Sequence, residues 1–199
     1  MKIIFDIRDY LERVWAISEK ISFDGSANSQ FIGSMLFSTL NICDAMQLLI
    51  EKRNFVSSNI LLRSLYEYMF RSFWLNRVAE FEDIQRCMKE DKWPATAALH
   101  TSIKGMNEII DLLAAEKVKI QSILNSYIHG GSQNPLSQLG DDNYITPNIP
   151  DTEVIYLLQV VQLCSYVILC ESIYLSNTNE FDSEVEVMGN NLLSADDIS

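Results

Sequence analysis

The most informative absence in this sequence is that of basic residues beyond Lys119. Residues 120–199 hold 11 acidic residues and no lysine or arginine, whereas residues 1–119 are nearly balanced, with 15 basic and 16 acidic residues. The formal net charge of −12 therefore lies almost entirely in the C-terminal part. Sequence-independent binding of a nucleic-acid backbone over a large surface needs a surplus of lysine and arginine. The composition therefore excludes a large basic face for nucleic acid. A small anion site around Arg63 and Arg71 is not excluded, because these two residues lie in the nearly neutral part of the chain.

Motifs for metal sites and for nucleophilic catalysis are also missing. The four cysteines form no C-x2-C pair, and the two histidines lie far from them and from each other in the sequence. There is no Gly-rich phosphate loop, G-x-S-x-G elbow, H-E-x-x-H or D-x-D-x-D pattern. We therefore expect no metal ion, no cofactor and no disulfide framework.

A signal peptide and a membrane anchor are not indicated either. The apolar run at the N-terminus is broken by Asp6, Arg8 and Asp9. Residues 154–175 match a membrane span in length and hold one charge, Glu171, but no lysine or arginine flanks them. Their glutamines and serines fall on one stripe of a helix. We expect a cytoplasmic protein without membrane contact, in which this helix is buried in the core or in a dimer interface; a membrane span is the alternative.

Strand signals are weak, because sustained period-2 alternation and Asn-Gly or Asp-Gly hairpin turns are absent. Apolar residues instead recur at steps of three and four. The sequence predicts an all-α, up-and-down bundle of about five or six helices. The predicted helical segments are 3–22, 29–52, 55–90 (one long helix or a bent pair), 95–129 (two or three pieces, with breaks at Gly105 and 114–119) and a last long helix capped by Asp151 or Thr152.

Turn and cap residues mark the predicted connections. Ser26 or Asn28 is expected to cap the second helix. Residues 92–94, Lys-Trp-Pro, end the third segment. Gly130-Gly131 is expected to stop the fourth, because glycine at C′ adopts the left-handed conformation without Cβ strain. Residues 132–150 contain three of the four prolines and are expected to form a long loop or linker.

The C-terminal end is strongly acidic. Residues 179–199 hold six acidic residues and no basic one, which is typical of a fraying segment. We expect a single bundle domain over residues 1–178 and a flexible acidic tail over residues 179–199. The acidic C-terminal part would suit a basic protein partner.

One predicted helix carries grouped charges inside an apolar stretch. Ten of the fifteen residues 61–75 are apolar or aromatic, and a helix that is apolar on all sides is normally buried. Arg63, Glu67 and Arg71 nevertheless share one face, at i, i+4 and i+8. They form either a weak, exposed salt-bridge ladder or a partly buried set. In the second case two arginines share one carboxylate and keep donors for an anion such as phosphate.

A second feature is the segment L-N-S-Y-I-H-G-G at residues 124–131. His129 lies at a predicted helix C-terminus, where the dipole favours a protonated imidazole. The ring either serves in acid–base chemistry or bonds to the last helical carbonyls as a structural group. His100 lies in an ordinary helical segment without a partner signal.

Together, R-x3-E-x3-R-x2-W (residues 63–74) and L-N-S-Y-x-H-G-G resemble a family of bacterial helical proteins known as a domain of unknown function. The resemblance covers roughly residues 30–175, and the second motif is the more specific. That family is similar to the HEPN superfamily (higher eukaryotes and prokaryotes nucleotide-binding) of small helical bundles. HEPN proteins often dimerise, and many are metal-independent RNases in toxin–antitoxin, abortive-infection and other phage-defence systems.

The site candidates all come from the two motifs. The catalytic candidates are Arg63, Glu67 and His129, and the binding candidates are Arg71, Asn125 and Tyr127. In an RNase, an imidazole takes the 2′-hydroxyl proton and an arginine stabilises the charge on the phosphorus centre. HEPN RNases have an arginine and a histidine on one helix with four to six residues between them, but at the matching positions before His129, residues 122–124, this sequence has Ser, Ile and Leu. Catalysis therefore requires Arg63 or Arg71 to meet His129 across the bundle or across a dimer.

Two functions from different classes follow. The first is a HEPN-like enzyme or nucleotide-binding protein of bacterial defence, acting on RNA or a nucleotide in a small pocket. The second is a non-catalytic helical dimer, adaptor or antitoxin-like protein that binds a basic protein partner through its acidic C-terminal part. Net charge favours the second, and the grouped polar residues favour the first. We also expect a homodimer, because the helices at 55–75 and 154–175 offer more apolar surface than a bundle of this size buries.

Overall fold

The structure is a computed structural model that describes residues 2–129, 131–132, 138 and 149–192. Within these residues it contains eight helices and no strand, which confirms the predicted all-α bundle. In chain order the helices are α1 (Lys2–Ser18), α2 (Ala27–Glu51), α3 (Phe55–Arg77), α4 (Phe81–Glu90), α5 (Thr96–Ile103), α6 (Glu108–Ile128), α8 (Asp151–Ser176) and α9 (Asp182–Asn190).

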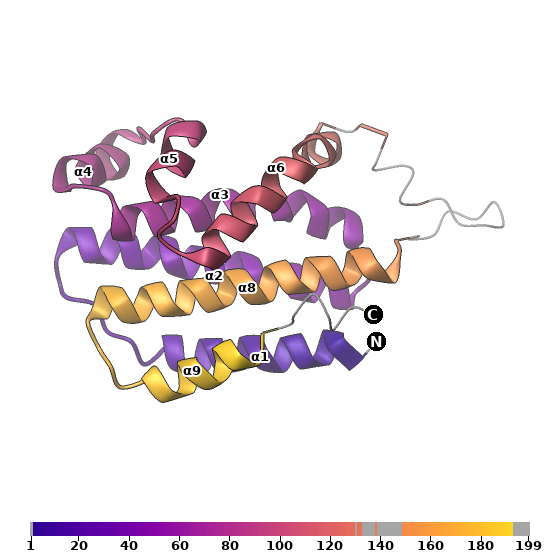
Figure 1. The fold of residues 1–199 in the computed structure, drawn as a ribbon, viewed down its shortest axis with the longest axis horizontal. Helices are drawn as coiled ribbons and strands as arrows, with labels where there is room; N and C mark the ends of the chain where they lie inside the picture. The colour runs from indigo at the N-terminus through magenta and orange to yellow at the C-terminus, as the bar shows by residue number, and fades with distance from the viewer. Residues whose placement is uncertain (1, 130, 133–137, 139–148, 193–199) are drawn as a thin grey trace.

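The long helices run up and down beside one another (Figure 1). Helices α2, α3 and α8 pack against each other, and α1 and α9 both contact α8. Helix α6 packs on α3, and the short helices α4 and α5 lie together at one end of the bundle (Figure 1). As a result, α3 is enclosed by α2, α5, α6 and α8, and its charged stripe lies beside α6.

Helix α3 lies at the centre because its apolar side chains point in nearly every direction. Tyr66, Phe70 and Phe73 are at most 2% exposed. Burying a large apolar side chain contributes about 1.5–3 kcal/mol, so these three residues hold the helix firmly in the core. The polar groups that share α3 are therefore carried on a well-anchored element.

The single charge inside the apolar run of α8 is neutralised by α3. Glu171 is 1% exposed, and its two carboxylate oxygens accept from Arg77 Nε at 2.7 Å and Arg77 Nη2 at 2.9 Å. Asn76 Nδ2 donates to the same carboxylate at 2.7 Å. A buried carboxylate without partners would be costly, so this bidentate contact fixes the end of α3 against α8.

Helices α2 and α8 are each long and apolar enough to cross a membrane, by length and composition alone. In α8, 61% of the most apolar stretch is buried inside the bundle. A core helix of a soluble protein has the same length and composition, so these properties do not identify a membrane protein.

Two predicted breaks are confirmed, and one is wrong. Gly105 lies between α5 and α6 with a φ of 79°, and the segment 55–90 is the bent pair α3 and α4. Helix α6, however, runs without interruption through residues 114–119. Alanine, glutamate and lysine are strong helix formers, and Lys117 faces the core. A segment that looks polar in sequence therefore continues the helix.

The predicted caps have different outcomes. The Oγ of Ser26 accepts from the backbone N–H of Ser29 at 3.2 Å and caps α2 as predicted. At the start of α8 the N-cap is Pro150, without a side-chain cap, so neither Asp151 nor Thr152 caps this helix. Asp151 lies in the first turn instead, where the helix dipole favours an acidic side chain.

Helix α6 ends where the glycine pair predicted a stop. Its C-cap is His129, and the backbone N–H of Gly131 donates to the carbonyl of Ser126 at 2.7 Å. A Cβ at Gly131 would collide with Ser126. Close approach of the backbone to the last turn of α6 therefore favours glycine at position 131. Gly130 lies outside the described residues.

The C-terminal part differs from the expected tail. Helix α9 forms within it, and Phe181 and Met188 are 5% and 4% exposed. Two acidic residues, Asp182 and Glu184, occupy the first turn of α9, where they complement the dipole. The start of the predicted tail is therefore a packed helix, while the domain boundary at residue 178 stays a prediction. Residues 193–199 lie outside the described residues, as does most of the expected loop, 132–150.

Candidate functional site

The charged stripe of α3 meets the second motif on α6. Arg63 Nε donates to Glu67 Oε1 at 3.1 Å, and Arg63 Nη1 donates to Asn125 Oδ1 at 3.2 Å. Gln121 Nε2 donates to the same oxygen of Asn125 at 3.1 Å. The side chains of Arg63 and Glu67 are 32% and 36% exposed. The two sequence motifs thus meet in one polar group that water can reach.

Arg71 does not share the carboxylate of Glu67, in contrast to the prediction. Its guanidinium carbon lies 4.8 Å from the centre of the Trp93 ring, a cation–π contact. Trp93 belongs to the segment between α4 and α5, and its Nε1 donates to Asp91 Oδ1 at 2.8 Å. Within the described part of the chain, Arg71 forms no ion pair, and its side chain is half-buried.

Lys117 of α6 lies close to both arginines. It is 5% exposed, and its Nζ lies 5.4 Å from the centre of the Phe70 ring. Burial lowers the pKa of Lys117; Glu67 opposes this change, and the positive charges of Arg63 and Arg71 add to it. Lys117 makes no hydrogen bond or ion pair with any residue that the structure describes. The charge of Lys117 is stabilised only by the face of the Phe70 ring and by the nearby carboxylate of Glu67, so this lysine is a largely buried cation without a direct ion pair among the described residues.

His100 of α5 packs on the same aromatic ring. Its ring centre lies 4.5 Å from that of Phe70. Its Nε2 is buried and finds no hydrogen-bond partner among the residues described. Burial and the charge of Lys117 lower the pKa of His100, so the imidazole is neutral at neutral pH. A partner for His100 could not be predicted from the sequence, because the contact depends on how α5 packs against α3.

The other two predicted site residues lie apart from this group. Tyr127 is 4% exposed and lines a cavity of about 440 Å³ between α3, α6 and α8, where Asn59 Nδ2 donates to Glu153 Oε1 at 3.1 Å. His129 is exposed, and its side chain forms no hydrogen bond or ion pair with described residues. Its backbone N–H donates to the carbonyl of Asn125 at 3.0 Å. His129 therefore lies one turn beyond Asn125, about 6 Å further along the axis.

Lys117 is the functional candidate that the prediction missed, although its position in the sequence gives a signal. It lies in a stripe of buried α6 residues at helical spacing: Ile110, Leu113, Lys117, Leu124 and Tyr127. A lysine at a core position indicates a buried cation, because lysine is almost never fully buried without a partner. The predicted break at 114–119 hid this stripe, since a broken helix has no continuous face.

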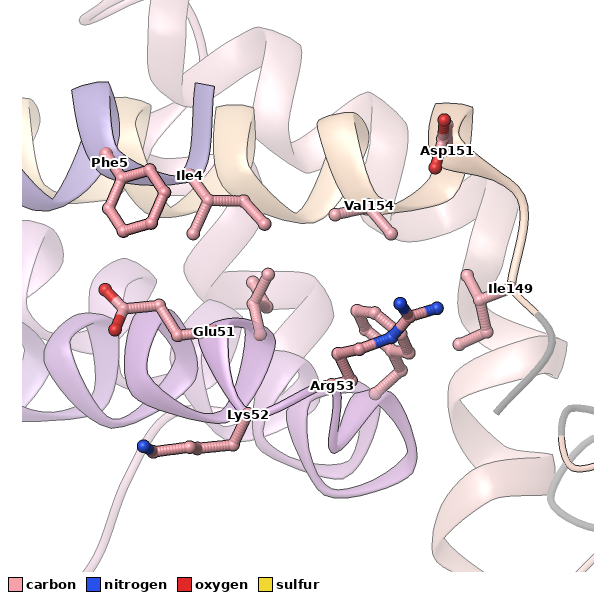
Figure 2. Close-up of a pocket in the computed structure, with 10 residues that line it drawn as sticks. Ile4, Phe5, Glu51, Lys52, Arg53, Ile149, Asp151 and Val154 are labelled. Atoms are coloured by element: carbon pink, nitrogen blue, oxygen red, sulfur yellow. The ribbon is translucent and has the colours of Figure 1, made fainter. Parts of the chain in front are cut away.

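Another cavity, of about 380 Å³, lies where α1 begins, α2 ends and α8 begins (Figure 2). Arg53 has a φ of 56°, and its side chain reaches toward Ile149, while Lys52 points away (Figure 2). Glu51 and Asp151 also line the cavity, so charges of both signs are present. The helix dipole stabilises basic side chains near the C-terminal end of a helix. This stabilisation accounts for Arg53 after α2 without a ligand.

The charges around Lys117 indicate the class of ligand. We call Arg63, Arg71 and Lys117, with Glu67 beside them, the cation cluster. In its protonated form it has three positive side chains and one carboxylate, an excess of two positive charges. Arginine and lysine donors in this number suit an oxyanion. Among the residues that the structure describes, no group of three or more histidine, cysteine and acidic side chains could hold a metal ion.

Residues 38–193 match the Family of unknown function (DUF6988). The chain belongs to this family. The match runs from α2 through α9, so it includes the cation cluster and extends beyond residue 178. No curated protein and no solved structure matches the chain. The family assignment agrees with the expected domain of unknown function.

Proposed function

We propose that the protein binds RNA or a nucleotide through a phosphate group held by the cation cluster, as a HEPN-like component of a bacterial phage-defence or toxin–antitoxin system. One observation supports the binding proposal: Lys117 is 5% exposed and lies close to Arg63 and Arg71, and it forms no direct ion pair with any described residue. A charge in this situation is typical of a functional site, where a ligand completes its environment.

Free donors on the arginines support this proposal. A guanidinium has five N–H donors, and Arg63 uses two of them, one toward Glu67 and one toward Asn125. The others are available to a ligand at a side chain that is 32% exposed. The guanidinium of Arg71 lies over the Trp93 ring and forms no ion pair with any described residue, so its N–H donors can bind an oxyanion. Phosphate oxygens are natural acceptors for both groups.

The catalytic form of the proposal uses Arg63, Glu67 and His129. His129 lies four residues after Asn125, on the same side of α6, so a phosphodiester bound by Arg63 lies within about one helical turn of the imidazole. His129 would take the 2′-hydroxyl proton, and the 2′-oxygen would attack the phosphorus. The 5′-oxygen would leave with a proton, giving a cyclic phosphate end. Arg63 would stabilise the developing negative charge, and Glu67 would orient Arg63.

The binding proposal is tested by fluorescence polarisation with a labelled single-stranded RNA, and with nucleotides as competitors. Arg63→Ala and Lys117→Met should each weaken binding about tenfold or more, because each removes a charged contact to phosphate. Arg8→Ala is the control, since Arg8 lies on α1 and pairs with Glu51. Equal affinity of all four proteins, or absence of binding by the wild type, would contradict the proposal.

The catalytic form is tested separately by expression toxicity and examination of total RNA. Wild type should be toxic and should cleave RNA, whereas Arg63→Ala and His129→Ala should be harmless. If all three proteins behave alike and the RNA stays intact, the proposed nuclease reaction is refuted, while the proposal of ligand binding is unaffected.

We also propose a cytoplasmic location and a homodimer. Leu112, Val118 and Ile123 of α6 are 51%, 72% and 42% exposed, and apolar surface of this kind favours a protein contact. Light scattering at micromolar concentration should give the mass of a dimer. A monomer would refute this part, and fractionation of cells into soluble and membrane parts tests the location.

The second candidate function is a non-catalytic adaptor or antitoxin-like protein. Its support is the described acidic helix α9, whose Asp182, Glu184 and Glu186 are exposed. A basic protein partner would contact this surface. Replacement of the three acids by their amides should abolish co-purification with such a partner and leave RNA binding unchanged; unchanged co-purification would exclude α9 as the contact.

A further inference from the structure

A small aromatic cavity adjoins the cation cluster. It has a volume of about 240 Å³ and lies between the C-terminal half of α3, helix α4 and the segment that precedes α5. Trp74, Trp93 and Cys87 line it, and Asp83 and Arg86 provide charged groups in its wall. The cavity is smaller than the 300–1,000 Å³ typical of a pocket for a whole ligand, so it suits one part of a larger molecule.

Arg71 joins this cavity to the cation cluster. Its guanidinium lies over the Trp93 ring at 4.8 Å, and Trp74 follows it on the same helix, about 4.5 Å further along the axis. Arg71 is also close enough to Lys117 and to Cys87 for its charge to lower the pKa of both groups, although burial raises the pKa of the thiol overall. Trp93 both contacts Arg71 and lines the aromatic cavity, so this side chain connects the cavity to the cation cluster.

We propose that this cavity holds the base of a nucleotide whose terminal phosphate occupies the cation cluster, an inference that rests on the proposed function. Tryptophan rings are good partners for nucleobases, because every base has a π-face. Asp83 and Arg86 form an ion pair with each other in the wall, and the second carboxylate oxygen of Asp83 and the further N–H groups of Arg86 supply an acceptor and donors for the edge of a base. The excess of two positive charges in the cluster matches a phosphate monoester, which is largely a dianion above its second pKa of about 6.

The structural alternative is that Trp93 only fills space. Its ring also lies 6.5 Å from that of Phe31, so packing alone accounts for its position. Packing does not require an open cavity beside two tryptophans and two charged side chains. The two explanations differ in one measurable property, the contribution of a base to affinity.

The test compares AMP with ribose 5-phosphate by isothermal titration calorimetry, since the two ligands differ only in the base. Wild type should bind AMP about tenfold more tightly than ribose 5-phosphate. Trp93→Leu should lose the preference and bind AMP and ribose 5-phosphate with the same affinity. Trp15→Leu is the matched control, because Trp15 lies on α1 and contacts Phe37, and it should keep the tenfold preference.

A second measurement does not depend on a variant that folds. The three tryptophans, Trp15, Trp74 and Trp93, each contribute one indole N–H signal to a ¹H–¹⁵N NMR spectrum of the wild type, and titration with each ligand follows these signals. AMP should shift the signals of Trp74 and Trp93 and leave that of Trp15 in place, whereas ribose 5-phosphate should shift none of them strongly.

Three results would overturn the inference. If wild type binds AMP and ribose 5-phosphate equally well, the base has no subsite, while phosphate binding by the cation cluster still stands. If AMP leaves the signals of Trp74 and Trp93 unchanged, the base lies elsewhere. If neither ligand binds, both this inference and nucleotide binding as the proposed function fail.

Discussion

Replacement of Lys117 by methionine should make the protein more stable. Methionine is unbranched and adaptable, so it can occupy the space of the lysine stem beside Phe70 without the charge. Replacement of buried ionic groups by apolar ones is often neutral or stabilises by about 1–4 kcal/mol. Because Glu67 already compensates part of the charge, we expect the lower half of this range, about 1–2 kcal/mol. In a domain of this size, that corresponds to a rise in Tm of about 2–8 °C.

The gain in stability should depend on pH in a defined direction. Burial holds the pKa of Lys117 below its unfolded value of 10.5. Between the folded pKa and the unfolded pKa, the unfolded chain binds more protons than the folded one, so wild-type stability rises with pH in this window. Lys117→Met lacks this titration. The difference between the two proteins should therefore be largest at neutral pH and shrink as the pH approaches 10.5.

The assay is urea unfolding followed by circular dichroism, at neutral and at alkaline pH. The matched control is Lys104→Met, since Lys104 is exposed and should change the unfolding free energy by no more than about 0.5 kcal/mol. A loss of stability in Lys117→Met, or a gain that is the same at both pH values, would refute the view that burial of Lys117 destabilises its charged form.

Three further predictions concern other parts of the fold. In Lys117→Met the pKa of His100 should rise toward 6.5, because one of the two causes of its lowering is removed; an NMR titration that shows no rise would contradict the contact. Arg77→Met should lower the unfolding free energy by about 2–3 kcal/mol, because it leaves Glu171 buried without its charged partner, and a further change of Glu171 to methionine should restore part of the loss. Gly131→Ala should cost about 1–2 kcal/mol, because its Cβ would collide with the last turn of α6, and a Tm equal to that of wild type would exclude this close approach.

The helical architecture followed from the sequence because its signals are local. Apolar spacing identified the helices, Ser26 marked the start of α2, and Gly105 marked the break before α6. The burial of α3 also followed from its apolar residues on every side. Helix α9 was missed because acidic composition outweighed a weaker signal, the apolar pair Phe181 and Met188, which lie seven residues apart on one face.

The candidate site could be predicted only in part. The pairing of Arg63 with Glu67 follows from a spacing of four residues on one helix. The contact of Arg71 with Trp93 does not, because it depends on how the segment between α4 and α5 folds back on α3. Likewise, the approach of Lys117 to His100 arises from three helices that meet around Phe70. Such contacts depend on tertiary packing, which the periodicity of a single helix does not encode.

The central claim is that the cation cluster exists to hold a phosphate group, and a comparison of AMP binding by wild type and Lys117→Met tests it most directly. Because the variant is expected to be more stable, unfolding cannot explain a loss of binding. We predict that calorimetry at neutral pH will show affinity for AMP reduced about tenfold or more in a variant that melts at a higher temperature. Equal affinity for AMP in the two proteins would contradict the claim.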